Sequence, residues 1–390
     1  MSVKYCLSRG ATALLWICVA SRFAAGASQP HYLVTNDDAP SSNSVTFYTV
    51  GADGLLTLKQ QVLTGGFGIG GGYFAASRVT TLDSGSEQCV YASEASTGDV
   101  VGIDVGTLQV GGSAFGSATD GGSSNGIGLA NNARYLYASF TDSNTIGTFQ
   151  LQPGCSLTFV NDVSVAGLQG GIIDGMAIHG KMLVATYGDG SIESFDLSSG
   201  TPVSNGDEQS STAYLKSHGA TYPNSVEITK DGRYALFGDT STSTVVEVSA
   251  ISSAKLTATV VFSLGRSASS SNIMLSPDET LLYISNTQGD RITAAWFDKS
   301  TGQLSAGCAS NKLKGYSSSW SYLAALAPET DKGTGGVLYV AEFGSPSSIG
   351  MVRMKSTGGK CSLKELSGSP VADPNSPGLL SIGTFPPRSF

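Results

Sequence analysis

A short pattern of hydrophobic and small residues returns seven times along the chain. Each copy is a run of β-branched and aromatic residues that ends in small or polar ones, and a second such run follows after a few turn residues. Runs of this kind, bounded by turn residues, predict hairpins of β-strands. The copies lie roughly 46 to 58 residues apart, which is the period expected of propeller blades. The seven copies are HYLVTND (31–37), CVYASE (89–94), YLYASF (135–140), MLVATYGD (182–189), YALFGD (234–239), LLYISN (281–286) and VLYVAEF (337–343).

A further strand is predicted before six of these copies, because a similar run precedes each of them across a tight turn. The first copy begins too early in the mature chain to have one. The segment PGLLSIGTF (377–385) has the pattern of this inner strand, but no second strand follows it. Pairing it with the N-terminal blade would cover the open edge of that blade. We therefore predict an all-β fold, a seven-bladed β-propeller of four-stranded antiparallel blades that is closed by its C-terminal strand.

The first 27 residues have the pattern of a secretory signal peptide. Lys4 and Arg9 precede an apolar run over residues 11–20, and Ala25-Gly26-Ala27 offers a small-residue cleavage site. This run is too short to span a bilayer comfortably, and no later segment could span one. We therefore predict a signal peptide at residues 1–27 and one propeller domain at residues 28–390. The protein should be secreted or periplasmic, with no attachment to a membrane after signal removal.

The charge of the chain narrows the range of partners. Of its 390 residues 13% are charged, and the net charge is −8. An acidic surface repels phosphate backbones, so we predict no nucleic-acid binding. We expect the propeller to be a monomer.

The sequence offers little for a cofactor or a metal. The glycine-rich stretch at residues 65–73 is followed by a β-rich run instead of the helix that a dinucleotide site requires. The three histidines form no cluster for zinc or iron. We therefore predict neither a cofactor nor a metal, with a calcium ion at the acidic turns 36–38 or 188–190 as the alternative.

Four cysteines remain after the signal peptide, an even number that permits two disulfides in an exported chain. In the blade assignment Cys89 and Cys155 fall on hairpins at the same face of neighbouring blades, and so do Cys308 and Cys361. We favour these two pairs among the three connectivities that four cysteines allow.

Two stretches carry a more specific signature: ITKDGRYALFGDT (228–240) and LSPDETLLYISNTQGDRITAAWFDKSTGQL (275–304). They resemble the repeat of the seven-bladed lactonase-type propellers, which include 6-phosphogluconolactonases and carboxy-cis,cis-muconate cyclases. The resemblance implies a lactonase-like or cyclase-like activity on a small lactone, sugar-derived or aromatic-derived, at one mouth of the central channel. In that family histidine and arginine usually lie among the channel-lining strands, whereas the inner strands here carry Asn125, Asn224 and Asn272.

The strand order gathers the ends of the second strands and the starts of the inner strands on one face, which we call the top face. Opening a lactone needs a base that activates water and donors that hold the developing oxyanion. The candidate catalytic residues are Glu94, Asp174, His218 and Glu342 as bases and Arg266 at the oxyanion. The candidate ligand-binding residues are Asn36, Asp37, Phe67, Tyr73, Tyr222, Asn224, Asp239, Asn272, Asn286 and Trp320.

The same residues allow a second interpretation, a non-catalytic secreted binding or scaffold propeller. Polar groups at a channel mouth also hydrate a water-filled channel and cap strand ends. Arg78 is a second candidate at the oxyanion, but a charge in an inner strand is more often part of a structural ion pair. The sequence therefore leaves open whether the protein is an enzyme. In an enzyme the five candidate catalytic residues should lie within hydrogen-bond reach of one another, directly or through a water.

Overall fold

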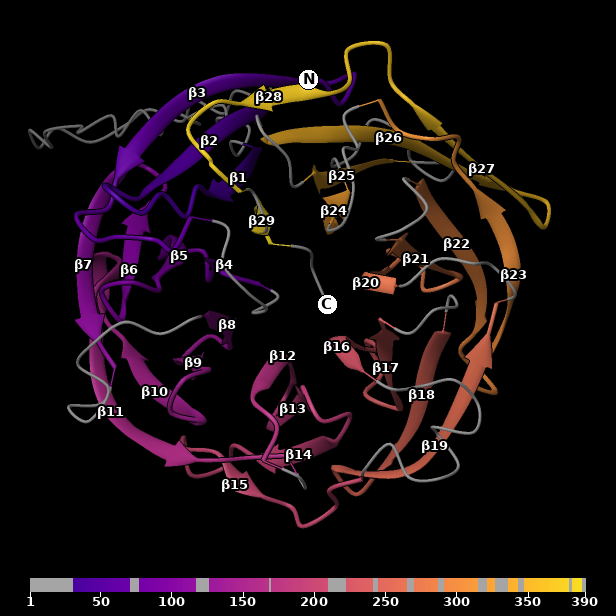
Figure 1. Cartoon of the computed structure of the whole chain (residues 1–390), viewed down its shortest axis with the longest axis horizontal. Helices are drawn as coiled ribbons and strands as arrows, with labels where there is room; N and C mark the ends of the chain where they lie inside the picture. The colour runs from indigo at the N-terminus through magenta and orange to yellow at the C-terminus, as the bar shows by residue number, and fades with distance from the viewer. Residues whose placement is uncertain are drawn as a thin grey trace, which may run out of the picture.

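The computed structural model describes residues 31–70, 77–116, 126–167, 170–209, 222–240, 245–264, 270–286, 291–314, 321–326, 336–342, 347–378 and 381–387, and all structural statements below concern these residues. Their strands, β1 to β29, form seven antiparallel sheets around a central axis (Figure 1). The helical element among them is the three-residue 3-10 helix η1 (Pro153–Cys155). The predicted seven-bladed propeller is therefore confirmed.

Each blade consists of an inner, a second, a third and an outer strand. Blade 1 contains β29 (Ser381–Phe385), β1 (Tyr32–Asn36), β2 (Ser44–Val50) and β3 (Leu56–Leu63). Blades 2 to 4 contain β4 (Val79–Asp83), β5 (Gln88–Glu94), β6 (Asp99–Asp104) and β7 (Gln109–Phe115); β8 (Ile127–Asn131), β9 (Tyr135–Phe140), β10 (Thr145–Leu151) and β11 (Leu157–Ser164); and β12 (Ile173–His179), β13 (Met182–Tyr187), β14 (Ile192–Asp196) and β15 (Val203–Ser204). Blades 5 to 7 contain β16 (Pro223–Ile228), β17 (Tyr234–Asp239), β18 (Val245–Ser252) and β19 (Lys255–Ser263); β20 (Ser270–Leu275), β21 (Leu281–Asn286), β22 (Arg291–Asp298) and β23 (Gln303–Ala309); and β24 (Ser321–Leu326), β25 (Val337–Glu342), β26 (Ser347–Thr357) and β27 (Lys360–Glu365).

Blade 7 differs from the prediction in having a fifth strand, β28 (Val371–Asp373). The long third strand β26 explains this, because β27 pairs with its second half and β28 with its first three residues. The two short strands thus share the outer position of one blade.

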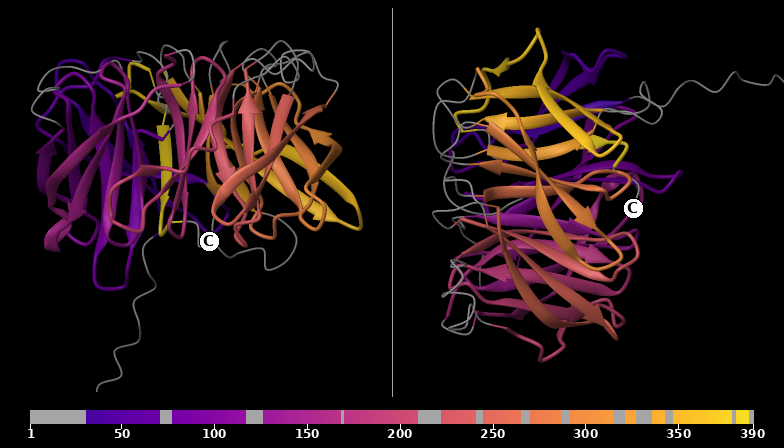
Figure 2. Two further views of the ribbon diagram at one scale, coloured as in Figure 1. Left: turned by 90° about the horizontal axis from the view of Figure 1, so that it is seen from below. Right: turned by 90° about the vertical axis from the view of Figure 1, so that its right-hand side faces the viewer.

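The ring is closed by the C-terminal strand, as the sequence predicted. β29 pairs antiparallel with β1, from Ser381 opposite Asn36 to Phe385 opposite Tyr32. The Thr81 hydroxyl of blade 2 donates to the Thr384 carbonyl oxygen at 2.7 Å, which ties the closing strand to the next blade as well. The seven inner strands contact one another in sequence around the axis, and the side views show the blades as a flat cylinder (Figures 1 and 2).

The blades are held together by apolar side chains on both faces of each sheet. In blade 1 Leu33 belongs to the same buried apolar cluster as Tyr339 of blade 7, while its neighbour Val34 belongs to the same cluster as Val90 of blade 2. Burying one such side chain contributes about 1.5 to 3 kcal/mol. This two-sided burial explains why the second strands are near-continuous hydrophobic runs, whereas the outer strand β3 is mostly exposed.

Two disulfides join neighbouring blades, in the predicted pairs. Cys89–Cys155 links blade 2 to blade 3, and Cys308–Cys361 links blade 6 to blade 7. These disulfides are compatible with a location outside the cytoplasm. The predicted signal peptide, residues 1–27, lies outside the described residues. Among the described residues there is no helix with the length and apolar character needed to cross a membrane.

Candidate functional site

The structure gathers the ends of the second strands and the starts of the inner strands on one face, as expected. In blade 5 Asp239, the last residue of β17, is opposite Pro223, the first residue of β16. In blade 7 Glu342 of β25 is likewise opposite Ser321 of β24. Because this pairing repeats around the ring, the described candidate residues at these strand ends lie on the rim of the top face.

Three neighbouring inner strands depart from regular pairing at this rim. The ladder passes over Asp174 between β12 and β13, Asn224 between β16 and β17, and Ser271 between β20 and β21. The inner strands of blades 1 to 3 pair without such an interruption. A β-bulge leaves one residue unpaired and re-aims its side chain, and bulges are frequent beside active sites. The rim of blades 4 to 6 is therefore where the fold redirects inner-strand residues.

Asp174 is the carboxyl on the first of these bulges. It is 1% exposed, and neither of its oxygens accepts a well-oriented hydrogen bond from a described residue. Burial raises the pKa of Asp174 to about 8; the nearby Tyr222 hydroxyl opposes this shift, and the Asp189 carboxylate adds to it. A carboxyl with this pKa is half-ionised near pH 8 and has free oxygens to accept a proton, as a general base requires.

Tyr222 reaches Asp174 from the neighbouring blade. A Cβ atom on Gly188 would lie 3.1 Å from the Tyr222 Oη and 3.3 Å from the Asp174 Oδ2, so glycine leaves room for both groups. The Tyr222 backbone is held at the top of blade 5, because its N–H donates to the Asp239 Oδ2 at 2.7 Å and its carbonyl oxygen accepts from the Thr240 N–H at 3.0 Å. Blades 4 and 5 thus share one group of side chains.

Asn224 completes this group. It is 4% exposed, its Oδ1 has no hydrogen-bond partner among the described residues, and it lies two residues after Tyr222, on the bulge of β16. Its carbonyl oxygen lies close to Gly175, the residue after Asp174. We call Asp174, Tyr222, Asn224 and Asp239 the blade 4/5 cluster. A carboxyl, a hydroxyl and an amide are the groups needed to activate water and hold a polar ligand.

Glu94 lies elsewhere, between blades 1 and 2. It is fully buried beneath Gly66, and the Asn43 Nδ2 donates to its Oε1 at 3.3 Å, while its Oε2 has no well-oriented partner among the described residues. Burial raises the pKa of Glu94 to about 8. Asn36 belongs to the same region, where its Nδ2 donates to the Ser93 carbonyl oxygen at 2.8 Å.

Arg78 forms a buried ion pair in this region. Its Nη1 lies 2.6 Å from the Asp38 Oδ2, and both side chains are almost fully buried. This is the structural arrangement that the sequence favoured for a charge in an inner strand.

Three other candidates donate or accept hydrogen bonds within their own blade. The Ser348 hydroxyl donates to the Glu342 Oε2 at 2.6 Å, and burial raises the pKa of Glu342 to about 7. Asn286 donates through its Nδ2 to the Thr293 Oγ1 at 2.8 Å. Asp37 accepts hydroxyl groups of Thr35, Ser44 and Thr46, at distances between 2.5 and 2.8 Å.

The described candidate bases therefore do not form one group. Glu94, Asp174 and Glu342 come from β5, β12 and β25, which lie in different sectors of the ring (Figure 1). None of the three carboxyls is among the charges that shift the pKa of another. Asp174 is the one that the structure brings together with predicted ligand-binding residues.

Of the remaining candidates, the structure describes two and does not describe four. Phe67 is 43% exposed on the glycine-rich stretch, and Asn272 lies beside the bulge of β20. Tyr73, His218, Arg266 and Trp320 lie outside the described residues.

Among the described residues, sequence reasoning missed two fully buried acids, Glu247 in β18 and Asp373 at the end of β28. Glu247 interrupts the apolar run VVEVSA (245–250), and that interruption was a signal that could have found it.

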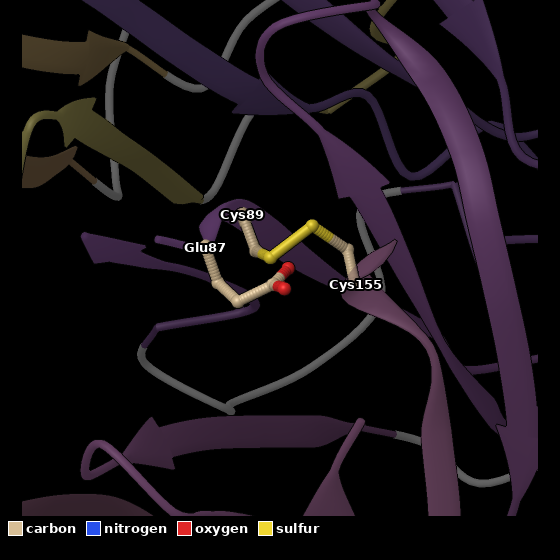
Figure 3. A group of neighbouring side chains, drawn as sticks. All are labelled: Glu87, Cys89 and Cys155. Atoms are coloured by element: carbon tan, nitrogen blue, oxygen red, sulfur yellow. A yellow bond between two sulfur atoms is a disulfide. The ribbon is translucent and has the colours of Figure 1, made fainter. Parts of the chain in front are cut away.

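One group of side chains has the composition of a metal site, Glu87 with Cys89 and Cys155. Figure 3 shows that the two cysteines are bonded to each other, so their sulfurs are not thiolate ligands. The Glu87 Oε2 instead accepts the Gly154 N–H at 3.1 Å, which ties the two hairpins together. This group is structural.

Comparison with known proteins assigns the chain to a family. Solved structures with the same fold include a candidate 6-phosphogluconolactonase from Bacteroides fragilis, with 14% identity, a TM-score of 0.69, and coverage of 92% of this chain and 98% of that one. The periplasmic gluconolactonase of Pseudomonas aeruginosa has 14% identity and a TM-score of 0.64, with coverage of 91% and 99%. Hydrazine synthase of Kuenenia stuttgartiensis is an enzyme of another kind, and its structure has a TM-score of 0.51 at 16% identity. The match covers 73% of this chain and 76% of that one.

At these identities the likeness is one of fold and not of activity. No curated protein sequence matches the chain. The profile of the family described as "Lactonase, 7-bladed beta-propeller" matches residues 90–367, which is more than half of the chain, and the protein therefore belongs to the lactonase-type seven-bladed β-propeller family.

Proposed function

We propose that this protein is an exported hydrolase that opens a small, uncharged, sugar-derived lactone at the blade 4/5 cluster, with Asp174 as the general base. One observation carries the proposal: Asp174 lies on a bulge of an inner strand, is buried without a well-oriented hydrogen-bond partner among the described residues, and has a pKa raised to about 8. Membership of the lactonase-type family supports the reaction class. The disulfides and the periplasmic gluconolactonase among the similar structures support export.

In the proposed reaction the ionised Asp174 takes a proton from a water molecule, whose oxygen attacks the lactone carbonyl carbon. The Asn224 amide is the donor that would hold the ring and its developing oxyanion, whereas the Tyr222 hydroxyl faces Asp174. The bond from the carbonyl carbon to the ring oxygen then breaks, and the ring oxygen takes the proton from Asp174 to give the hydroxy acid. Because the ionised carboxylate is the active form, the enzymatic rate should rise with pH and level off above about pH 8.

The substrate is proposed to be uncharged because the cluster itself is acidic. The negative charge of Asp189 raises the pKa of Asp174, and the Asp239 carboxylate accepts the Tyr222 N–H. A phosphate group placed here would meet like charges, which weaken binding and raise the pKa of the base further. Arg78, the candidate cation that the structure describes, already pairs with Asp38.

The alternative is a non-catalytic binding propeller. It is favoured by the dispersal of the buried carboxyls around the ring and by the hydroxyl groups that already donate to Asp37 and Glu342. In that case the blade 4/5 cluster would bind a polar ligand without turning it over.

A lactone panel decides between the two functions. Acid release from glucono-δ-lactone, 6-phosphoglucono-δ-lactone and an aromatic-derived lactone is followed by pH-stat, with the spontaneous rate subtracted. Asp174→Asn should lower kcat on the uncharged sugar lactone by about 100-fold or more. Glu342→Gln is the matched control, because it changes a buried carboxyl in another sector, and it should retain the rate. No enzymatic acid release from any lactone would favour the binding propeller, and a folded Asp174→Asn variant with the full rate would exclude Asp174 as the base.

A further inference from the structure

Glu247 is a buried acid that the proposed reaction does not use. It lies in the third strand of blade 5, between Phe237 and Val261 in the ladder. It is 0% exposed, and neither of its carboxyl oxygens accepts a hydrogen bond from a described residue. An ionised carboxylate that is buried without hydrogen-bond donors destabilises the folded state. Burial, together with the nearby Asp239, accordingly raises the pKa of Glu247 well above its ordinary value.

Asp239 is the diagonal neighbour of Glu247 on the same face of the sheet, because Glu247 is opposite Phe237 and Asp239 is opposite Val245. A protonated Glu247 has one hydrogen to donate, and the Asp239 carboxyl is the acceptor beside it. Asp239 is itself 0% exposed and accepts the Tyr222 N–H at 2.7 Å. At the other end of Tyr222, the hydroxyl lies beside Asp174 and lowers its pKa. A chain of contacts thus runs from the interior of blade 5 to the rim of blade 4.

We infer that Glu247 is a positioning residue for the blade 4/5 cluster: Glu247 holds its diagonal neighbour Asp239, Asp239 fixes the backbone of Tyr222, and the Tyr222 hydroxyl lies beside Asp174. The inference rests on the proposed function only for its catalytic meaning, because the chain of contacts is independent of any substrate. A neutral acid suits this place, since its single hydrogen satisfies Asp239, whereas a second carboxylate would repel it.

Two substitutions of Glu247 separate its role as a donor from its bulk. Glu247→Gln keeps a neutral donor of the same shape, whereas Glu247→Leu keeps a similar volume and has no donor. The carboxyl carbons of the 13C-labelled protein are titrated by NMR, with Asp174 assigned from the Asp174→Asn spectrum. Asp174 should titrate near pH 8 in the wild type and in Glu247→Gln, and at least half a pH unit higher in Glu247→Leu. Glu247 should titrate well above the ordinary range of a glutamate.

Equal shifts in Glu247→Gln and Glu247→Leu would overturn the inference, and so would a Glu247 that titrates at an ordinary pH. Should Glu247→Leu not fold, Tyr222→Phe tests the other end, because it removes only the hydroxyl. Its Asp174 midpoint should also rise, and an unchanged midpoint would refute the role of Tyr222. Since the titration needs no substrate, intact coupling without lactone hydrolysis would reject the proposed function alone.

Discussion

Replacing Asp373 by asparagine should stabilise the protein above neutral pH. Asp373 is the last residue of β28, just before the chain crosses from blade 7 to the closing strand. Its charge raises the pKa of Asp37, the residue that follows β1. Both carboxyls are 0% exposed. Tyr48 is close to the pair, because its own pKa is raised by burial and by both carboxyls. The seam where the ring closes therefore contains two buried acids that disfavour each other's ionisation.

The magnitude follows from the pKa of Asp37. Burial, and then Asp373, raise it from 3.8 to about 7. Between these two values the unfolded carboxyl ionises while the folded one stays protonated, so the free energy of unfolding falls as the pH rises. The loss is complete above about pH 7 and amounts to roughly 4 kcal/mol, at 1.36 kcal/mol for each tenfold change. Burial is the larger cause, so removing the Asp373 charge should restore on the order of 1 to 2 kcal/mol.

Urea unfolding followed by circular dichroism at pH 5 and pH 8.5, with both disulfides intact, measures this effect. Asp373→Asn should gain stability relative to the wild type at pH 8.5 and much less at pH 5. Asp162→Asn on the outer strand β11 is the matched control, and it should show no such difference. A gain that is the same at both pH values, or a loss at pH 8.5, would refute the reasoning about paired acids.

Three further predictions follow from the fold. Truncation before the closing strand β29 should leave the β1 edge unpaired and lower Tm by more than 10 °C or prevent soluble expression; a wild-type melting curve would contradict closure by this strand. Replacing Cys89 and Cys155 together by serine should cost roughly 2 to 4 kcal/mol in urea unfolding, because their link joins two blades across 66 residues; an unchanged midpoint would show that the pair does not constrain the chain. Gly188→Ala would crowd the Tyr222 Oη and the Asp174 Oδ2, and we expect about a tenfold lower kcat with little change in Tm; a fully active variant would place the chemistry away from these groups.

The blades could be predicted because each of their hairpins is local in the sequence. The apolar runs and the turns between them recur at a fixed period, so the strand pattern was readable without distant contacts. The closing strand was also predictable, since 377–385 was the one inner-strand pattern without a following hairpin. The extra strand β28 was not, because it depends on the unusual length of its partner β26.

The candidate site was predicted only in part. The end of a second strand marks the top face, but not the direction in which its side chain points. Glu342 lies next to Ser348 in its own blade, whereas Asp174 is displaced by a β-bulge. No single residue in the sequence predicts this bulge. Burial also decides which carboxyls have raised pKa values, and it depends on residues such as Gly66 and Gly188 that come from other segments.

The sequence by itself determined the number of blades, the order of their strands and the segment that closes the ring, and it favoured the cysteine pairs that join neighbouring blades. These follow from periodicity and chain order, which act over short distances along the chain. Only the tertiary structure decided which acids meet: Asp174 with Tyr222 at the rim, Glu247 with Asp239 inside blade 5, and Asp37 with Asp373 at the seam. The physical reason is that a pKa depends on burial and on charges a few ångströms away, and both are set by how separate sheets pack.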